Sequence, residues 1–199
     1  MKKIFAIILC LALLLSCTAL AETAEKESMG TVKVEEAFNI KCKMPEGYTL
    51  QLDEGLGDET HIAASVVSAD ESKPVVRVII AYNDEYTTFN EETKEKTAMR
   101  LNDVDEETLE SIKESFITDG EMTDVTYEET ETAYGTKLLV VKGLFMGEET
   151  VIVYTIYKSY EIEIAVEAAK SAEGDLTDEQ VKMITDCLSD MDFEEVKAE

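Results

Sequence analysis

Residues 136–168 read TKLLVVKGLFMGEETVIVYTIYKSYEIEIAVEA and carry the pattern that decides the fold. Apolar residues dominate three strand-length runs, which are separated by short turn signals at Gly147 and Ser159. Because tight turns join antiparallel neighbours, this stretch predicts an antiparallel meander. In the last run isoleucines alternate with Glu161 and Glu163, so one face of that strand is predicted to be buried and the other charged.

Further strands are predicted before the meander. Residues 123–130 supply its first strand, and residues 61–69 and 74–82 form two more. The run 74–82, PVVRVIIAY, is almost continuously apolar, which is typical of a central strand covered on both faces. Residues 38–44 and 48–52 alternate around a Pro-Glu-Gly turn and are predicted to form a hairpin.

Residues 83–119 have helical rather than strand periodicity. The β-branched runs stop there, and Leu109, Ile112 and Phe116 recur at helical spacing behind a candidate N-cap, Asp105. One or two helices are therefore expected between the strands.

A second helix signal lies near the C-terminus. Residues 177–180, TDEQ, form a capping-box pattern, and Val181, Ile184 and Leu188 share one face of the helix that would follow. Phe193 is expected to dock after this helix. The predicted fold is a single α+β domain over residues 32–199, with a mostly antiparallel sheet of about seven or eight strands, a helical insert and a C-terminal helix packed on the sheet.

The N-terminus has the anatomy of a cleavable export signal. Lys2 and Lys3 precede the apolar stretch 4–15, and Ala19-Leu20-Ala21 places small residues before a cleavage site after Ala21. The sequence thus predicts a signal peptide over residues 1–21, a flexible tether over 22–31, and secretion. No later apolar run is long enough to span a bilayer, so no transmembrane segment is expected in the mature chain.

A lipoprotein signal competes with this cleavage site. Residues 14–17, LLSC, resemble a lipobox, in which Cys17 would be lipidated and anchor the protein at the cell surface. The leucine before Ser16 is bulkier than lipoboxes usually carry, which favours soluble secretion over anchoring.

The chain is strongly acidic: 44 Asp and Glu residues against 18 Lys and Arg residues give a net charge of −26. Such a field repels phosphate backbones, so nucleic acid is excluded as a partner. An unknown protein or a small cationic ligand is the expected partner.

Cys42 and Cys187 are the two cysteines that remain once the leader is removed. Each is predicted on a buried face, and an oxidising compartment would permit a disulfide between them. Two separate buried thiols are the alternative reading.

Most catalytic signatures are missing from the sequence. It has one histidine, His61, and no G-x-S-x-G, H-E-x-x-H, P-loop or C-x-x-C motif, so no cofactor or catalytic residue is assigned. An EF-hand register can be written from Asp103 to Glu114, but its sixth position is Thr108 instead of glycine, and helix-start acidity explains it better. An envelope hydrolase that uses acidic residues, with or without His61, and a weak calcium- or cation-binding surface protein remain as alternatives.

Three aromatic residues form the candidate ligand rim. Tyr82, Tyr86 and Phe89 lie where the apolar strand gives way to the acidic insert, a setting in which aromatic rings and carboxylates can hold a cation. Packing of these rings at the edge of the core is the simpler reading.

The order of elements resembles the PsbP/MOG1-like fold of small secreted bacterial proteins. The likeness rests on the segment 40–47, IKCKMPEG, and on the closing LSDMDF of residues 188–193. It implies a scaffold used for binding and assembly rather than a shared chemistry. An exported, non-catalytic binding or interaction module of the bacterial envelope or extracellular space is therefore the expected function.

Overall fold

The computed structural model describes residues 29–34, 37–44, 46–53, 61–70, 73–167, 182 and 190–196. Its main element is a seven-stranded antiparallel sheet with the order β3-β4-β5-β11-β10-β9-β8. The strands are β3 (Tyr48–Leu52), β4 (His61–Ser68), β5 (Val75–Tyr82), β8 (Met122–Glu131), β9 (Lys137–Phe145), β10 (Glu148–Tyr157) and β11 (Tyr160–Glu167). The predicted meander is confirmed, because β8, β9, β10 and β11 pair in chain order.

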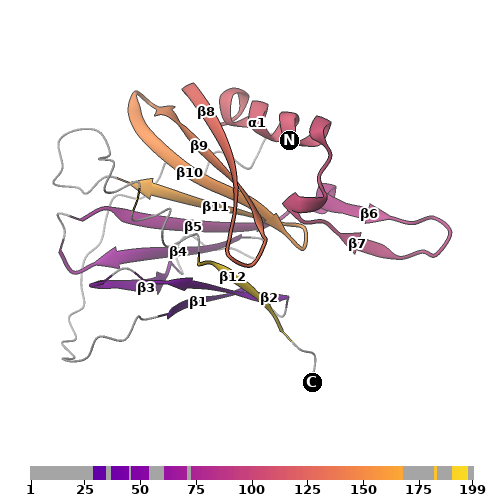
Figure 1. The fold of residues 1–199 in the computed structure, drawn as a ribbon, viewed down its shortest axis with the longest axis horizontal. Helices are drawn as coiled ribbons and strands as arrows, with labels where there is room; N and C mark the ends of the chain where they lie inside the picture. The colour runs from indigo at the N-terminus through magenta and orange to yellow at the C-terminus, as the bar shows by residue number, and fades with distance from the viewer. Residues whose placement is uncertain are drawn as a thin grey trace.

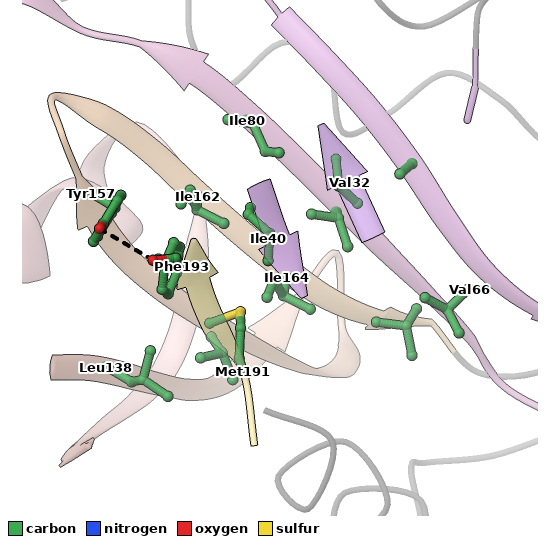
Figure 2. Packing of buried hydrophobic residues seen from close by; sticks show 14 of the residues in the cluster. Val32, Ile40, Val66, Ile80, Leu138, Tyr157, Ile162, Ile164, Met191 and Phe193 are labelled. Carbon is green, nitrogen blue, oxygen red and sulfur yellow. Dashed lines mark hydrogen bonds between the residues drawn. The ribbon is translucent and has the colours of Figure 1, made fainter. Parts of the chain in front are cut away.

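A three-stranded sheet covers one face of the large sheet. It has the order β1-β2-β12, with β1 at Met29–Val34, β2 at Phe38–Lys43 and β12 at Asp192–Glu195. Figure 2 shows Ile40 of this small sheet beside Ile162 and Ile164 of β11, and Phe193 beside Tyr157 of β10. The main apolar core therefore lies between two sheets, and Phe193 docks into it as expected.

The predicted hairpin of residues 38–44 and 48–52 is wrong. Both strands form, but β2 pairs with β1 and β12, whereas β3 pairs with β4 in the other sheet. The chain thus crosses from one sheet to the other at the turn that contains Gly47. Alternation of apolar residues predicts which face of a strand is buried, and it does not predict which strand lies beside it.

The opposite face of the large sheet is covered in part by a helix, α1, at Glu106–Thr118. Asp105 caps it as predicted, since Asp105 Oδ1 accepts a 2.8 Å hydrogen bond from the Thr108 backbone N–H. The three apolar residues at helical spacing are buried in a second core with β9 and β10. They are Leu109, Ile112 and Phe116.

The sequence predicts helical structure across residues 83–119, but the part of this segment before α1 does not form an α-helix. It contains two short 3-10 turns, η2 (Asp84–Tyr86) and η3 (Leu101–Asp103), and between them a two-stranded ribbon of β6 (Thr87–Phe89) and β7 (Lys96–Ala98). Figure 1 shows this ribbon projecting away from both sheets. Composition alone favours a helix here. Hydrogen bonds to the Asn90 side chain instead form a turn that reverses the chain between β6 and β7.

Two further expectations about strands need correction. β5 lies inside the sheet, but its residues at alternate positions are only half-buried; β10 is the strand whose residues from Val151 to Tyr157 are all buried. β1 begins at Met29, within the stretch expected to be a tether, because its apolar residues pair with β2 over the core.

The sheet-rich α+β class is confirmed, and the described α-helix is in the middle of the chain. The expected C-terminal helix falls almost wholly outside the described residues. No helix in the described part of the chain has the length and apolar character that crossing a membrane requires.

Candidate functional site: the ribbon and its root

The β6–β7 ribbon is the most exposed ordered element of the described chain. Phe89 on β6 is 49% exposed, and Lys94 Nζ lies 5.6 Å from the centre of its ring. The turn is held by Asn90, whose Oδ1 accepts hydrogen bonds from the backbone N–H groups of Glu92 (2.9 Å) and Thr93 (3.1 Å). The sequence thus builds a defined arm in place of an irregular loop.

The root of the ribbon is clamped by Ser159, which is fully buried in the turn between β10 and β11. Its backbone N–H donates to Met99 O (3.0 Å), and its Oγ donates to Tyr86 O (2.6 Å), so one residue binds both ends of the ribbon. Ser159 Oγ also lies 2.9 Å from Thr87 Oγ1, and Ser159 O accepts a 2.9 Å hydrogen bond from the Asn83 N–H. Every polar group of Ser159 therefore contacts the root.

Ser159 reaches this position because the β10–β11 turn has an uncommon backbone conformation. Lys158 and Ser159 have φ of 51° and 66°, and Tyr157 pairs with Tyr160 across them. Positive φ at both central residues is typical of a type I′ hairpin turn, where Asn and Gly are the usual residues. A residue other than glycine costs about 1 kcal/mol there, and the hydrogen bonds of Ser159 offset that cost.

A buried network of tyrosines and a carboxylate adjoins the root. Tyr154 on β10 donates a 2.8 Å hydrogen bond from Oη to Glu161 Oε1, and Asn83 Nδ2 donates a 3.1 Å hydrogen bond to Glu161 Oε2. The hydroxyl groups of Tyr154 and Tyr86 lie 3.5 Å apart. Glu161 is thereby held from both carboxylate oxygens, one of them by the residue that precedes the ribbon's 3-10 turn.

Both tyrosines keep their protons at physiological pH. Burial raises the pKa of Tyr86 to about 12, and the negative charges of Glu161 and Glu85 act in the same direction. Burial also raises the pKa of Tyr154 well above its usual value, with the charge of Glu161 as the next cause. The network can therefore hold the Glu161 carboxylate but supplies no phenolate.

Glu163 is the titratable group of the site. It lies on the same face of β11 as Glu161, opposite Tyr154 on β10 and Ile79 on β5. Loss of solvent around the carboxyl, and secondly the charge of Glu161, raise the pKa of Glu163 to about 7. A half-buried carboxyl that titrates near neutrality can take up or release a proton under physiological conditions.

The three residues of the predicted rim are not gathered into one site. Tyr82 is 51% exposed and contacts the ring of Tyr160 at 5.3 Å, on the side of the main core. Tyr86 packs against the second core instead, and Phe89 lies on the ribbon. All three nevertheless border the arm: Tyr82 Oη lies 3.4 Å from Thr87 Oγ1, Tyr86 precedes β6, and Phe89 is part of it.

The remaining candidates are dispersed. Cys42 packs half-buried against the main core, as predicted, while Cys187 and Cys17 lie outside the described residues. His61 faces the other side of the large sheet, opposite Ala81, so it is not placed beside Cys42. The disulfide therefore stays a prediction.

The cation-binding alternative gains no support from the described residues. Within these ranges no three His, Cys, Asp or Glu side chains are grouped closely enough to hold a metal ion. The EF-hand register from Asp103 to Glu114 is occupied by η3, the cap at Asp105 and α1. This pattern therefore reflects the acidic residues that cap and begin α1.

Ser159 and the Glu161 network were missed at the level of sequence. The alternation of Glu161 and Glu163 with apolar residues was visible and predicted a solvated face. That face is instead half-buried beside β10. No local pattern marks Ser159, since its contacts come from segments far away in the chain.

No protein-family model matches this sequence, and no curated protein matches it significantly. Functional conclusions therefore rest on the residues of the chain itself.

Proposed function

We propose that this chain is an exported, non-catalytic interaction module of the bacterial envelope or extracellular space, and that the β6–β7 ribbon is its contacting arm. The observation that carries the proposal is the exposed ribbon with a buried, fully hydrogen-bonded root. An isolated two-stranded ribbon is marginally stable in water. A chain that anchors such a ribbon through Ser159 keeps it ordered for a partner.

An ordered arm favours binding because its ordering cost is met before the partner arrives. Phe89 offers a half-exposed aromatic ring, which is the type of residue enriched at interface centres. The net charge of −26 favours a protein with a basic surface, or a small cationic ligand, over an anionic partner.

Site-specific photocrosslinking in the native host tests this proposal. A photoreactive phenylalanine analogue at Phe89 is expected to give one defined adduct, which excess wild-type protein abolishes. A competitor in which residues 88–97 are replaced by Asn-Gly should leave the adduct intact. The same analogue at Tyr134, which is 64% exposed on another turn, is the matched control. Equal adducts from both positions, or none from Phe89, would contradict the proposal.

An envelope hydrolase is the second candidate, and Glu163 is the observation that favours it. A carboxyl with a pKa of about 7 has the properties of a general acid or base. Hydrolysis of an ester, peptide or glycan panel that is lost in Glu163→Gln would support this candidate. Absence of any turnover across the panel would remove it.

Export and anchoring belong to the same proposal. Residues 1–28 lie outside the described ranges, so cleavage after Ala21 and the alternative lipidation at Cys17 rest on sequence alone. A PsbP/MOG1-like scaffold is likewise proposed from the resemblance stated above, and it agrees with a role in binding.

We also propose that the C-terminal helix predicted after Thr177 packs on the large sheet. Lys182, the one described residue of that segment, is helical. The half-buried residues of β5 on the face beside α1 offer an apolar and polar surface for it.

A further inference from the structure

The carboxylate pair on β11 and the root of the arm share one residue, Glu161. Its carboxylate binds Asn83 and Tyr154, and Asn83 also binds the Ser159 carbonyl through its backbone N–H. In addition, Asn83 Oδ1 accepts a 3.0 Å hydrogen bond from the Glu85 N–H and so starts the 3-10 turn that leads into β6. The position of Glu161 is therefore linked directly to the backbone of the arm.

Glu163 is the neighbour that can change the environment of Glu161. The two side chains are separated by one residue on a β-strand, which places them on the same face. Across the described strands, no side chain or backbone group donates a hydrogen bond to Glu163, whereas Glu161 accepts two. Among the residues that the structure describes, donors thus compensate Glu161 but not Glu163.

Charged and titratable groups from the neighbouring strands can be placed by register. From β10, Tyr154 lies opposite Glu163 and stays protonated. From β5, Arg77 lies opposite Ala165, one same-face position along β11 from Glu163. From β4, His61 is two strands away, in line with Glu161. Glu161 is the nearest negative charge in this set.

We propose that ionisation of Glu163 loosens the root of the β6–β7 arm through Glu161 and Asn83. With Glu163 protonated, Glu161 is the single charge of the pair and is held by its two donors. With Glu163 ionised, the two carboxylates repel, and Glu161 is drawn toward water at the expense of its hydrogen bond to Asn83. The arm is then ordered below neutral pH and more mobile above it.

This inference rests on the proposed role of the ribbon as the contacting arm, and it adds regulation by pH. The raised pKa of Glu163 agrees with it, since a value of about 7 places the change within the physiological range. A partner therefore meets a preorganised arm at mildly acidic pH. At alkaline pH binding has a larger entropic cost, because the arm must be ordered when the partner binds.

A single tryptophan on the arm tests the inference directly. The chain contains no tryptophan, so Phe89→Trp supplies the only such reporter, and its anisotropy decay in the full mature protein measures local motion. Between pH 5.5 and 8.5 we expect the fast component to grow through one transition with a midpoint near 7. Near-UV circular dichroism across the same range checks that the fold is intact.

Three variants in the Phe89→Trp background assign the transition. Glu163→Gln should abolish it and leave the arm ordered at both pH extremes, whereas Glu128→Gln, an exposed carboxylate on β8, should leave it unchanged. Asn83→Ala should make the arm mobile even at pH 5.5. A transition that survives Glu163→Gln at the same midpoint, or no transition in the reference protein, would overturn the inference. The crosslinking experiment at Phe89, made at one pH, reports separately on whether the arm has a partner.

Discussion

The Ser159 hydroxyl donates a 2.6 Å hydrogen bond to the carbonyl oxygen of Tyr86, a residue 73 positions earlier in the chain. The same carbonyl accepts a 2.9 Å hydrogen bond from the Met99 N–H at the other end of the ribbon. This contact explains why a ribbon that packs on neither sheet has a defined direction. It also makes the β10–β11 turn part of the candidate site.

Removal of the Ser159 hydroxyl should weaken the whole domain and the arm most of all. Ser159→Ala keeps the positive φ and loses contacts to Tyr86 and Thr87, so unfolding is expected to need about 1–3 kcal/mol less. Ser159→Gly loses the same contacts but relieves backbone strain of about 1 kcal/mol, so it should be the milder change. Urea denaturation and amide exchange of residues 87–98 measure both effects; a glycine variant less stable than the alanine variant would contradict this reading.

Glu163→Gln should stabilise the protein at high pH and have little effect at low pH. The pKa of Glu163 is raised in the folded state from 4.5 to about 7, so the folded state binds more protons than the unfolded state between these values. Stability contributed by this carboxyl is present below pH 4.5 and is lost as pH rises through 7.

At 1.36 kcal/mol per unit the full shift is worth about 3 kcal/mol, and we expect about 1–2 kcal/mol because the carboxyl is partly exposed. Chemical denaturation at pH 5 and pH 8 measures the difference between variant and wild type. Glu128→Gln on the exposed edge strand is the control and should show no such pH dependence. A Glu163→Gln variant that is less stable than wild type at pH 8 would show that the carboxylate is compensated.

Phe193 should be essential for joining the small sheet to the large one. Its ring stacks on that of Tyr157 with 4.4 Å between the ring centres, and the Arg100 guanidinium lies 4.6 Å from the centre of the Tyr157 ring. Phe193→Ala is therefore expected to cost about 3–5 kcal/mol of unfolding free energy. Phe89→Ala, at a half-exposed position, should cost less than about 0.5 kcal/mol. Thermal denaturation of the Phe193→Ala and Phe89→Ala variants measures the difference between a ring in the core and a ring on the arm.

The intact mass of the exported protein decides between the two processing sites. Cleavage after Ala21 predicts a mature chain that begins at Glu22, and a disulfide between Cys42 and Cys187 would make it two hydrogens lighter. Lipidation predicts a chain that begins at Cys17 and carries added acyl mass. A mass that includes residues 1–16 would show that neither signal is processed.

The strands of the large sheet and the mid-chain helix followed from the sequence because their signals are local. Period-two alternation marked the strands, and Asp105 with Leu109 and Phe116 marked α1. Sheet assignment was less accessible: the segment around Ile40 looked like the partner of the next strand, yet it pairs with β1 and β12. Pairing depends on which distant strand completes the core, and the periodicity of a segment does not specify that strand.

Only the approximate location of the candidate site could be predicted from the sequence. Tyr82, Tyr86 and Phe89 were recognised as aromatic residues in an acidic segment, and they do border the arm. Their separation onto different sides could not be predicted, because the sequence pattern of this segment predicts a helix. A ribbon this short has little intrinsic stability, and its contacts with Ser159 favour it over a helix.

The sequence by itself determined the acidic charge, the export signal that we predict, the strands of the meander and the capped helix, because each depends on composition or on neighbouring residues. Tertiary structure alone decided the rest. Asn83 meets Glu161 across 78 positions, and Ser159 meets Tyr86 across 73. Such contacts form only when β5 and β11 pair and the core between the sheets closes, so their chemistry belongs to the folded chain and not to any segment of it.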